Sequence, residues 1–334
     1  MKKHSGGKIT MNTNFRKLIK FGKNSFVMTI PKDWIRENKL TNKNVLFVEE
    51  KDNDLVVSLK EGPEKKDTIK IIDIQNKPIG MIRAEIISGY LSNYNIVEIH
   101  GKDLREKAQE IKNILHNLVG VEIIEQTGNR MVAKDLLDIK EVSIQNMIRR
   151  IDLLVRGMME DSISHLDKPH CIKCGMCESI DQRDGDVKRM HYLARRVIKS
   201  ALSDPRLARF FNISNVNLLA SYVIISSLEK VGDQIKRVTR CYKSFTISKK
   251  AIKELQEIYQ KLFEEYKRVM KAYYKKEILV SYQIEIDKSL VIEVDKFLQK
   301  HSEASTSRAI EYLKEIENNI RHIAREITFQ EEDV

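Results

Sequence analysis

The second half of the chain repeats its apolar residues with the period of an α-helix. Ile144, Ile148, Ile151, Val155 and Met158 follow one another at intervals of three or four positions, which places them on one helix face. A helix with one apolar face is stable only when that face is buried, so such segments must pack together. The repeats predict helices at 141–166, 183–203, 214–242, 248–277, 282–300 and 304–328.

These six helices define the architecture that we expect for residues 141–330. Pro205 interrupts the pattern, and the second helix should stop just before it. The other connectors are short, and short connectors place successive helices antiparallel. The sequence therefore predicts an all-α pair of three-helix bundles in tandem.

Residues 67–136 have a different pattern, in which short apolar runs alternate with helical ones. The expected elements are a strand at 68–74, a helix at 79–91, a strand at 96–99, a helix at 104–118 and a hairpin of strands 121–125 and 130–133. This βαβαββ order favours a small α/β domain.

Residues 14–60 form a small predicted β unit, which follows a polar tail at 1–13 that we expect to be disordered. Its expected elements are strands at 15–21 and 25–30, a short helix at 32–38 and a hairpin of strands 45–50 and 55–59. Gly22 begins a turn, and Pro31 stands where a helix can begin because its missing N–H is not needed there. The chain as a whole is thus predicted to be multidomain.

Positive charge is concentrated at the front of the chain. The net charge is +11, and residues 1–48 contribute +9 of it, with eleven lysines and arginines against two acids. Localised positive charge indicates that this region binds phosphate backbones or acidic partners. The alternative is a basic tail that only increases solubility.

A cysteine-rich segment follows the first predicted long helix. Cys171, Cys174 and Cys177 have the C-x2-C-x2-C spacing of the first three ligands of a ferredoxin-type cluster. With His170 or the distant Cys241 as a fourth ligand, the same thiolates would satisfy tetrahedral zinc. Zinc, an iron–sulfur cluster and no metal all remain open from these residues.

Residues 16–60 resemble the swapped-hairpin AbrB/SpoVT DNA-binding domain, through the run RKLIKFGKNSFVMTIPKDWIRENKL and the hairpin after it. The resemblance implies that two copies interleave their strands into one small β-barrel, so that the protein is a homodimer. It also implies double-stranded DNA as a partner. The DNA-binding residues would be Arg16, Lys17, Lys20, Lys23, Lys32 and Arg36. The alternative is a module for dimerisation or for binding a toxin, with a solvated basic face.

Two helical motifs stand out in residues 141–330: SLEKVGDQIKR at 227–237, and RDGDVKR at 183–189 followed by Tyr192 and Leu193. Through these motifs, residues 141–330 resemble the PhoU family of phosphate-uptake regulators. The joining of an AbrB-like module to such bundles through a small α/β segment resembles archaeal PhoU-like regulators.

The PhoU resemblance implies carboxylate pairs four residues apart that bind a divalent or ferric metal, because such residues share a helix face. Glu229 and Asp233 fit, and Asp184 would be their neighbour, but position 188 is lysine. The alternative is a set of ion pairs in which Lys188 contacts Glu229 or Asp233. In the second bundle, the matching positions are Val291, Asp295, Lys314 and Asn318, so that site is expected to be lost.

These features predict a DNA-binding transcriptional regulator of phosphate uptake, whose bundles sense a signal or dock a partner. The alternative is an adaptor that restrains a phosphate ABC transporter or a sensor kinase without binding DNA. A weaker third reading is a redox or metal sensor working through the cysteine segment.

No Walker-type phosphate loop or nucleophile elbow is found in the sequence, so we do not expect an enzyme. The N-terminal residues lack the apolar run of a signal peptide, and no segment approaches the ~20 apolar residues of a membrane span. We therefore expect a cytoplasmic protein without membrane insertion.

Overall fold

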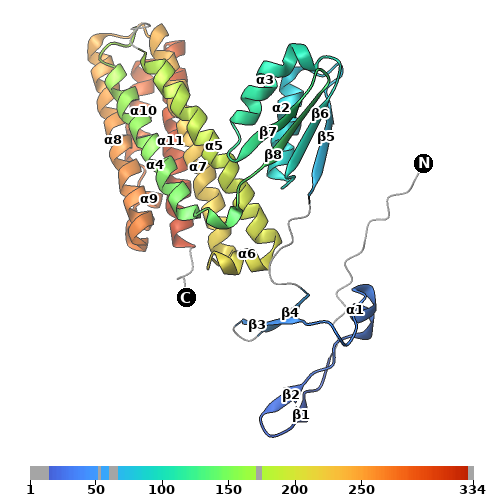
Figure 1. Cartoon of the computed structure of the whole chain (residues 1–334). Coiled ribbons are helices and arrows are strands. Elements are labelled where there is room, and N and C mark those ends of the chain that lie inside the picture. The colour runs from blue at the N-terminus through green and yellow to red at the C-terminus, as the bar shows by residue number, and fades with distance from the viewer. Residues whose placement is uncertain (1–14, 52–53, 60–66, 171–174, 330–334) are drawn as a thin grey trace, which may run out of the picture. The chain divides into compact units, whose positions relative to one another are not determined.

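A computed structural model describes residues 15–51, 54–59, 67–170 and 175–329 (Figure 1). The chain divides into two compact units, Met1–Glu64 and Lys65–Val334. The first contains the described β hairpins and one short helix, and the second contains the α/β layer and all the long helices.

The first unit consists of two separate antiparallel hairpins and one short helix. Strands β1 (Ile19–Phe21) and β2 (Ser25–Val27) pair across a turn in which Gly22 has a left-handed φ of +73°. Helix α1 (Lys32–Glu37) follows Pro31, as the sequence predicts. Strands β3 (Phe47–Lys51) and β4 (Asp54–Ser58) form the second hairpin, and no sheet joins the two hairpins among the described residues.

This unit has no core of its own among its described side chains. None of them is buried, and Phe15, Leu18 and Phe21 are 93%, 70% and 70% exposed. Exposure of so many apolar groups is costly, because their burial is the main force that stabilises a fold. The interleaved barrel needs a second copy, and it stays a prediction.

The second unit begins with a four-stranded mixed sheet. Its elements are β5 (Ile69–Asp73), α2 (Ile79–Leu91), β6 (Ile96–His100), α3 (Leu104–His116), β7 (Val121–Gln126) and β8 (Arg130–Asp135). The strand order is β5-β6-β8-β7, in which β5 and β6 are parallel and the other pairs are antiparallel. Helices α2 and α3 cover one face of the sheet (Figure 1), and the buried isoleucines of both layers form its core. The βαβαββ order is that predicted.

The remainder of this unit is helical. Its helices are α4 (Ile144–His165), α5 (Met176–Ser203), α6 (Pro205–Phe210), α7 (Asn215–Cys241), α8 (Lys249–Lys275), α9 (Ile278–Ile286), α10 (Ser289–Lys300) and α11 (Ala304–Thr328). Short 3-10 turns precede α4, at Ile139–Glu141, and follow α7, at Tyr242–Ser244. Three of the long helices begin at serines whose hydroxyls accept a backbone N–H three residues on: Ser143 for α4, Ser214 for α7 and Ser248 for α8.

The strands predicted at 15–21 and 25–30 are shorter than expected, at Ile19–Phe21 and Ser25–Val27. Two of the predicted long helices also have the wrong bounds, and each has a local cause. The helix expected at 282–300 is divided into α9 and α10, because Asp287 is in an extended conformation and its carboxylate accepts the Ser289 N–H at 2.9 Å. Helix α5 begins at Met176 rather than at 183, directly after Gly175, whose φ is +69°. Pro205 ends α5 as predicted, and it opens the short helix α6.

The helices form two groups of three that share one continuous core. One group is α4, α5 and α7, and the other is α8, the α9–α10 pair and α11. Helices α7 and α11 pack along the seam between the groups, and buried residues on both, such as Ile235 and Ile320, belong to the same cluster. The bundles are thus fused side by side. Within the described part of the chain, no helix has the length and apolar character of a membrane span.

A buried polar contact joins the sheet to the helices. Arg196 on α5 is 2% exposed, and its Nη2 donates to Asp135 Oδ2 at 2.6 Å. The same guanidinium lies 4.6 Å from the ring centroid of Tyr90, and its Nε donates to Asn93 Oδ1 at 3.3 Å. This contact is one of those that join the α/β layer and the helices in one compact unit.

Candidate functional site

The six basic residues predicted to contact DNA all lie on the surface of the first unit. Arg16 and Lys17 precede β1, Lys20 lies within it, and Lys23 lies in the turn to β2. Lys32 and Arg36 are on α1, and all six side chains are exposed. Among the described residues, Arg36 alone of the six has a carboxylate within ion-pair distance, that of Asp33 at 3.6 Å. The unit therefore offers cations that are little compensated.

A cleft of about 910 Å³ lies within this unit. Its lining includes the apolar side chains Met28, Trp34, Leu55 and Val57, the cations Arg16 and Lys32, and the carboxylates Asp33 and Glu37. The cleft thus brings charged groups of both signs together with apolar groups that the single unit covers only in part.

The acidic residues predicted to bind a metal lie on α5 and α7, where the two aspartate carboxylates form ion pairs with lysines. Lys236 Nζ lies 2.6 Å from Asp184 Oδ2 and 2.8 Å from Asp233 Oδ1. Lys188 Nζ lies 2.8 Å from Asp184 Oδ2 and 3.4 Å from Asp233 Oδ1. Arg237 Nε donates to the other oxygen of Asp233 at 2.7 Å. We call these five residues the α5–α7 ion-pair network.

The carboxylates in and beside this network respond differently to their surroundings. Burial acts to raise the pKa of Asp233, but hydrogen bonds and charge from Lys236 and Arg237 outweigh it and lower that pKa to about 2. Burial raises the pKa of Glu229, and Lys188 offsets this only in part. For Lys188, burial favours the neutral amine, yet its contacts with Asp184 and Asp233 raise its pKa.

These residues do not fit a metal site. Two ammonium groups already lie at hydrogen-bond distance from the carboxylates that a metal would need, and a third cation would be repelled. Within the described ranges, no group of three or more His, Cys, Asp or Glu side chains is placed to hold a metal ion. Lys188 forms an ion pair with Asp233, which is the alternative to a metal site that the sequence left open. The role of Lys236 was missed, although its position three residues after Asp233 was a signal for it.

In the second bundle, Asp295 pairs with Lys314 at 2.7 Å, at the place where the resemblance implied a lost metal site.

The predicted metal site of the cysteine-rich segment, which we call the cysteine clip, lies only partly within the described residues, since Cys171 and Cys174 fall outside them. Cys177 is the second residue of α5, and His170 Nδ1 lies 3.3 Å from the Lys243 carbonyl oxygen. Zinc or an iron–sulfur cluster at this clip stays a prediction.

The fold and these surfaces define a helical-bundle protein with a small α/β layer and a separate basic β unit. No protein-family model matches the sequence, and no curated protein matches it either. A solved structure of similar fold is that of PhoU from Pseudomonas aeruginosa, with a TM-score of 0.46 and 14% identity. The similarity covers 55% of this chain and 93% of that one. At this level, the likeness assigns neither a family nor a function to this chain.

Proposed function

We propose that this protein is a homodimeric DNA-binding transcriptional regulator of phosphate uptake, in which the helical unit senses a signal or docks a partner. The observation that carries the proposal is that the first unit exposes apolar and basic side chains together. Each kind of exposure supports one part of the proposal.

The apolar exposure supports dimerisation. Isolated two-stranded hairpins are at best marginally stable, and a unit of this size buries too little surface to fold alone. Val48 and Leu55 are exposed on the second hairpin, and the cleft beside Leu55 and Val57 has room for a chain segment. A second copy of the same unit would cover these groups and join the unpaired strands into one barrel.

The basic exposure supports DNA as the partner. Twofold symmetry doubles the six cations, and cations that neutralise phosphates release counterions from DNA. Arg16 and Arg36 are the two with the bidentate reach to read bases, so sequence specificity should be modest and should depend partly on DNA shape. The link to phosphate uptake rests on the resemblance of residues 183–193 and 227–237 to the PhoU family.

The test measures binding of the full chain to duplex DNA. Fluorescence anisotropy gives the affinity at 50 and at 200 mM salt. Six or more phosphate contacts should weaken binding by roughly 10³-fold or more across this range. The triple variant Lys20→Gln, Lys23→Gln, Arg36→Gln should bind more weakly and should show a shallower salt dependence, by roughly 0.9 in log–log slope for each lost contact.

A matched control removes three exposed lysines of α8, as Lys253→Gln, Lys271→Gln, Lys275→Gln, and it should leave binding unchanged. Equal losses in both triple variants, or no binding at 50 mM salt, would contradict DNA recognition and favour the adaptor role. Chromatin occupancy measured with and without phosphate then tests the physiological assignment, which fails if occupancy ignores phosphate.

A further inference from the structure

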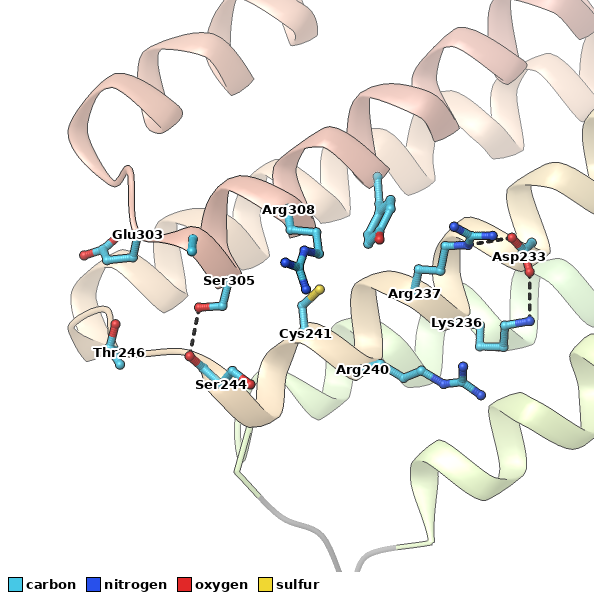
Figure 2. Close-up of a pocket in the computed structure, with 12 residues that line it drawn as sticks. Asp233, Lys236, Arg237, Arg240, Cys241, Ser244, Thr246, Glu303, Ser305 and Arg308 are labelled. Atoms are coloured by element: carbon cyan, nitrogen blue, oxygen red, sulfur yellow. Dashed lines mark hydrogen bonds and ion pairs between the residues drawn. The ribbon is translucent and has the colours of Figure 1, made fainter.

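A second basic surface lies in the helical unit, at the seam between α7 and α11. There a cleft of about 750 Å³ is bounded by the C-terminal end of α7, the turn after it and the first turns of α11 (Figure 2). Its lining residues include four cations, Lys236, Arg237, Arg240 and Arg308, and two carboxylates, Asp233 and Glu303. The lining therefore carries more positive than negative charge.

The cations of this seam cleft differ in how far they are already compensated. Asp233 accepts from both Lys236 and Arg237, so its charge is shared between them. Arg240 pairs with Asp181 at 2.9 Å, but both side chains are about half exposed, and such surface pairs contribute little. Arg308 has no carboxylate within ion-pair distance among the described residues, and it projects from α11 toward α7 (Figure 2). Arg308 and Arg240 are thus the cations most available to a ligand.

The walls of the seam cleft are held in place by the fold. The Ser305 hydroxyl on α11 donates to the Ser244 carbonyl at 2.8 Å, which ties the two walls together (Figure 2). The Arg237 guanidinium lies 5.8 Å from the centre of the Tyr312 ring. Behind the cleft, Val238 of α7 and Ile310 of α11 belong to the continuous core. Little rearrangement is therefore needed before an anion binds.

We propose that the seam cleft binds a small molecule that carries two or more phosphate groups. Arginines recognise phosphate through paired N–H donors, and several of them facing one space suit a ligand with several phosphates. The volume is in the range of small-molecule sites and exceeds what one orthophosphate would fill. The positive N-terminal end of α11 opens at the same place and adds to the attraction.

This inference goes beyond DNA binding and does not depend on it, because every residue involved lies in the second unit. Two sources share the ligand chemistry, namely inorganic oligophosphates and nucleoside polyphosphates. Tripolyphosphate and ATP are therefore the separate probes, with orthophosphate as the single-phosphate comparison.

The measurement uses the full chain and has a local readout, since the first unit is also basic. Isothermal titration gives the affinity, and peptide-resolved hydrogen exchange over residues 303–312 reports binding at the cleft itself. Tripolyphosphate, ATP or both should slow exchange in this segment, and which of them does so identifies the source.

Two variants with opposite expected effects on ligand affinity make the test more specific. Arg308→Gln should weaken binding about tenfold, the effect of losing one charged hydrogen-bonding partner. Glu303→Gln should tighten it, because this removes a negative charge without removing a cap: the Glu303 side chain makes no capping hydrogen bond. The control Arg150→Gln removes an exposed arginine of α4 that does not line the cleft, and binding should be unchanged.

Three results would overturn the proposal. One is binding without slowed exchange over 303–312, which would place the anion elsewhere. Another is an equal loss in Arg308→Gln and Arg150→Gln, which would indicate non-specific charge attraction. The third is protection by orthophosphate or duplex DNA while tripolyphosphate and ATP give none, which would exclude the proposed ligand class.

Discussion

Glu229 and Asp233 are four residues apart on α7, yet folding shifts their pKa values in opposite directions. Asp233 receives hydrogen bonds from Lys236 and Arg237, whereas burial dominates at Glu229. Helical spacing predicted that Asp184 and Lys188 share one face of α5, and that Glu229 and Asp233 share one face of α7. That these two faces meet was implied only by the PhoU resemblance. The sequence did not reveal how two lysines divide between two aspartates, since this depends on the rotation of α5 against α7.

The pKa of Glu229 is raised above its ordinary value of 4.5, so its ionised form destabilises the fold. Below pH 4.5 Glu229 is protonated in both the folded and the unfolded chain, so it does not lower the free energy of unfolding. That free energy declines as the pH rises through the folded-state pKa of Glu229. Glu229→Gln should raise the urea midpoint at pH 7, and the gain should vanish near pH 4. A lower midpoint at pH 7 would show that the carboxylate is stabilising instead.

Asp233→Asn is the matched variant of opposite sign. The folded-state pKa of Asp233 is about 2, below its ordinary 3.8, so its stabilisation is present above pH 3.8 and is lost toward pH 2. The substitution should cost about 1.5–3 kcal/mol of unfolding free energy at pH 7, the range for hydrogen bonds to charged groups. That cost should shrink as the pH falls from 4 to 2, and a cost independent of pH would mean that packing is responsible.

At the scale of the elements, periodicity predicted which segments are helical but not where each one is interrupted. The stripe at 304–328 matches α11 because nothing local opposes it. The stripe at 282–300 continues through Asp287, whose carboxylate binds the backbone and separates α9 from α10. Apolar spacing cannot register such a side-chain-to-backbone contact.

The N-cap of α8 can be tested directly. The Ser248 hydroxyl accepts the Ala251 N–H at 3.2 Å, so Ser248→Ala should cost about 1 kcal/mol of unfolding free energy. Ser248→Asp keeps an acceptor at the same place and should stay within a few tenths of a kcal/mol of the original chain. Urea titration followed by circular dichroism at 222 nm distinguishes them, and equal stability of all three chains would mean that the cap does not contribute.

At the scale of the whole molecule, the first unit is the part for which one copy of the chain does not supply a buried core. Its hairpins and helix were predicted from local signals, namely Gly22 in a turn and Pro31 before α1. The partner that completes its core was implied only by resemblance, because sequence patterns do not distinguish a strand paired within one chain from one paired with a second copy.

The expected dimer is tested by placing charge on its apolar surface. Val48 and Leu55 are 57% and 58% exposed, so Val48→Asp with Leu55→Asp should disturb a single unit little but should oppose its pairing. Analytical ultracentrifugation should give twice the chain mass for the original protein and the single chain mass for the variant. Leu279→Asp, at a 77% exposed position on α9, is the control and should remain dimeric. A monomeric original chain would contradict the assembly.

Lys236 belongs both to the α5–α7 ion-pair network and to the lining of the seam cleft. Asp184 does not line that cleft, yet its carboxylate offsets the ammonium charge of Lys236 from the far side. The electrostatic potential at the seam is therefore set partly from α5. Neutralising Asp184 would make that potential more positive without altering any group on the cleft wall.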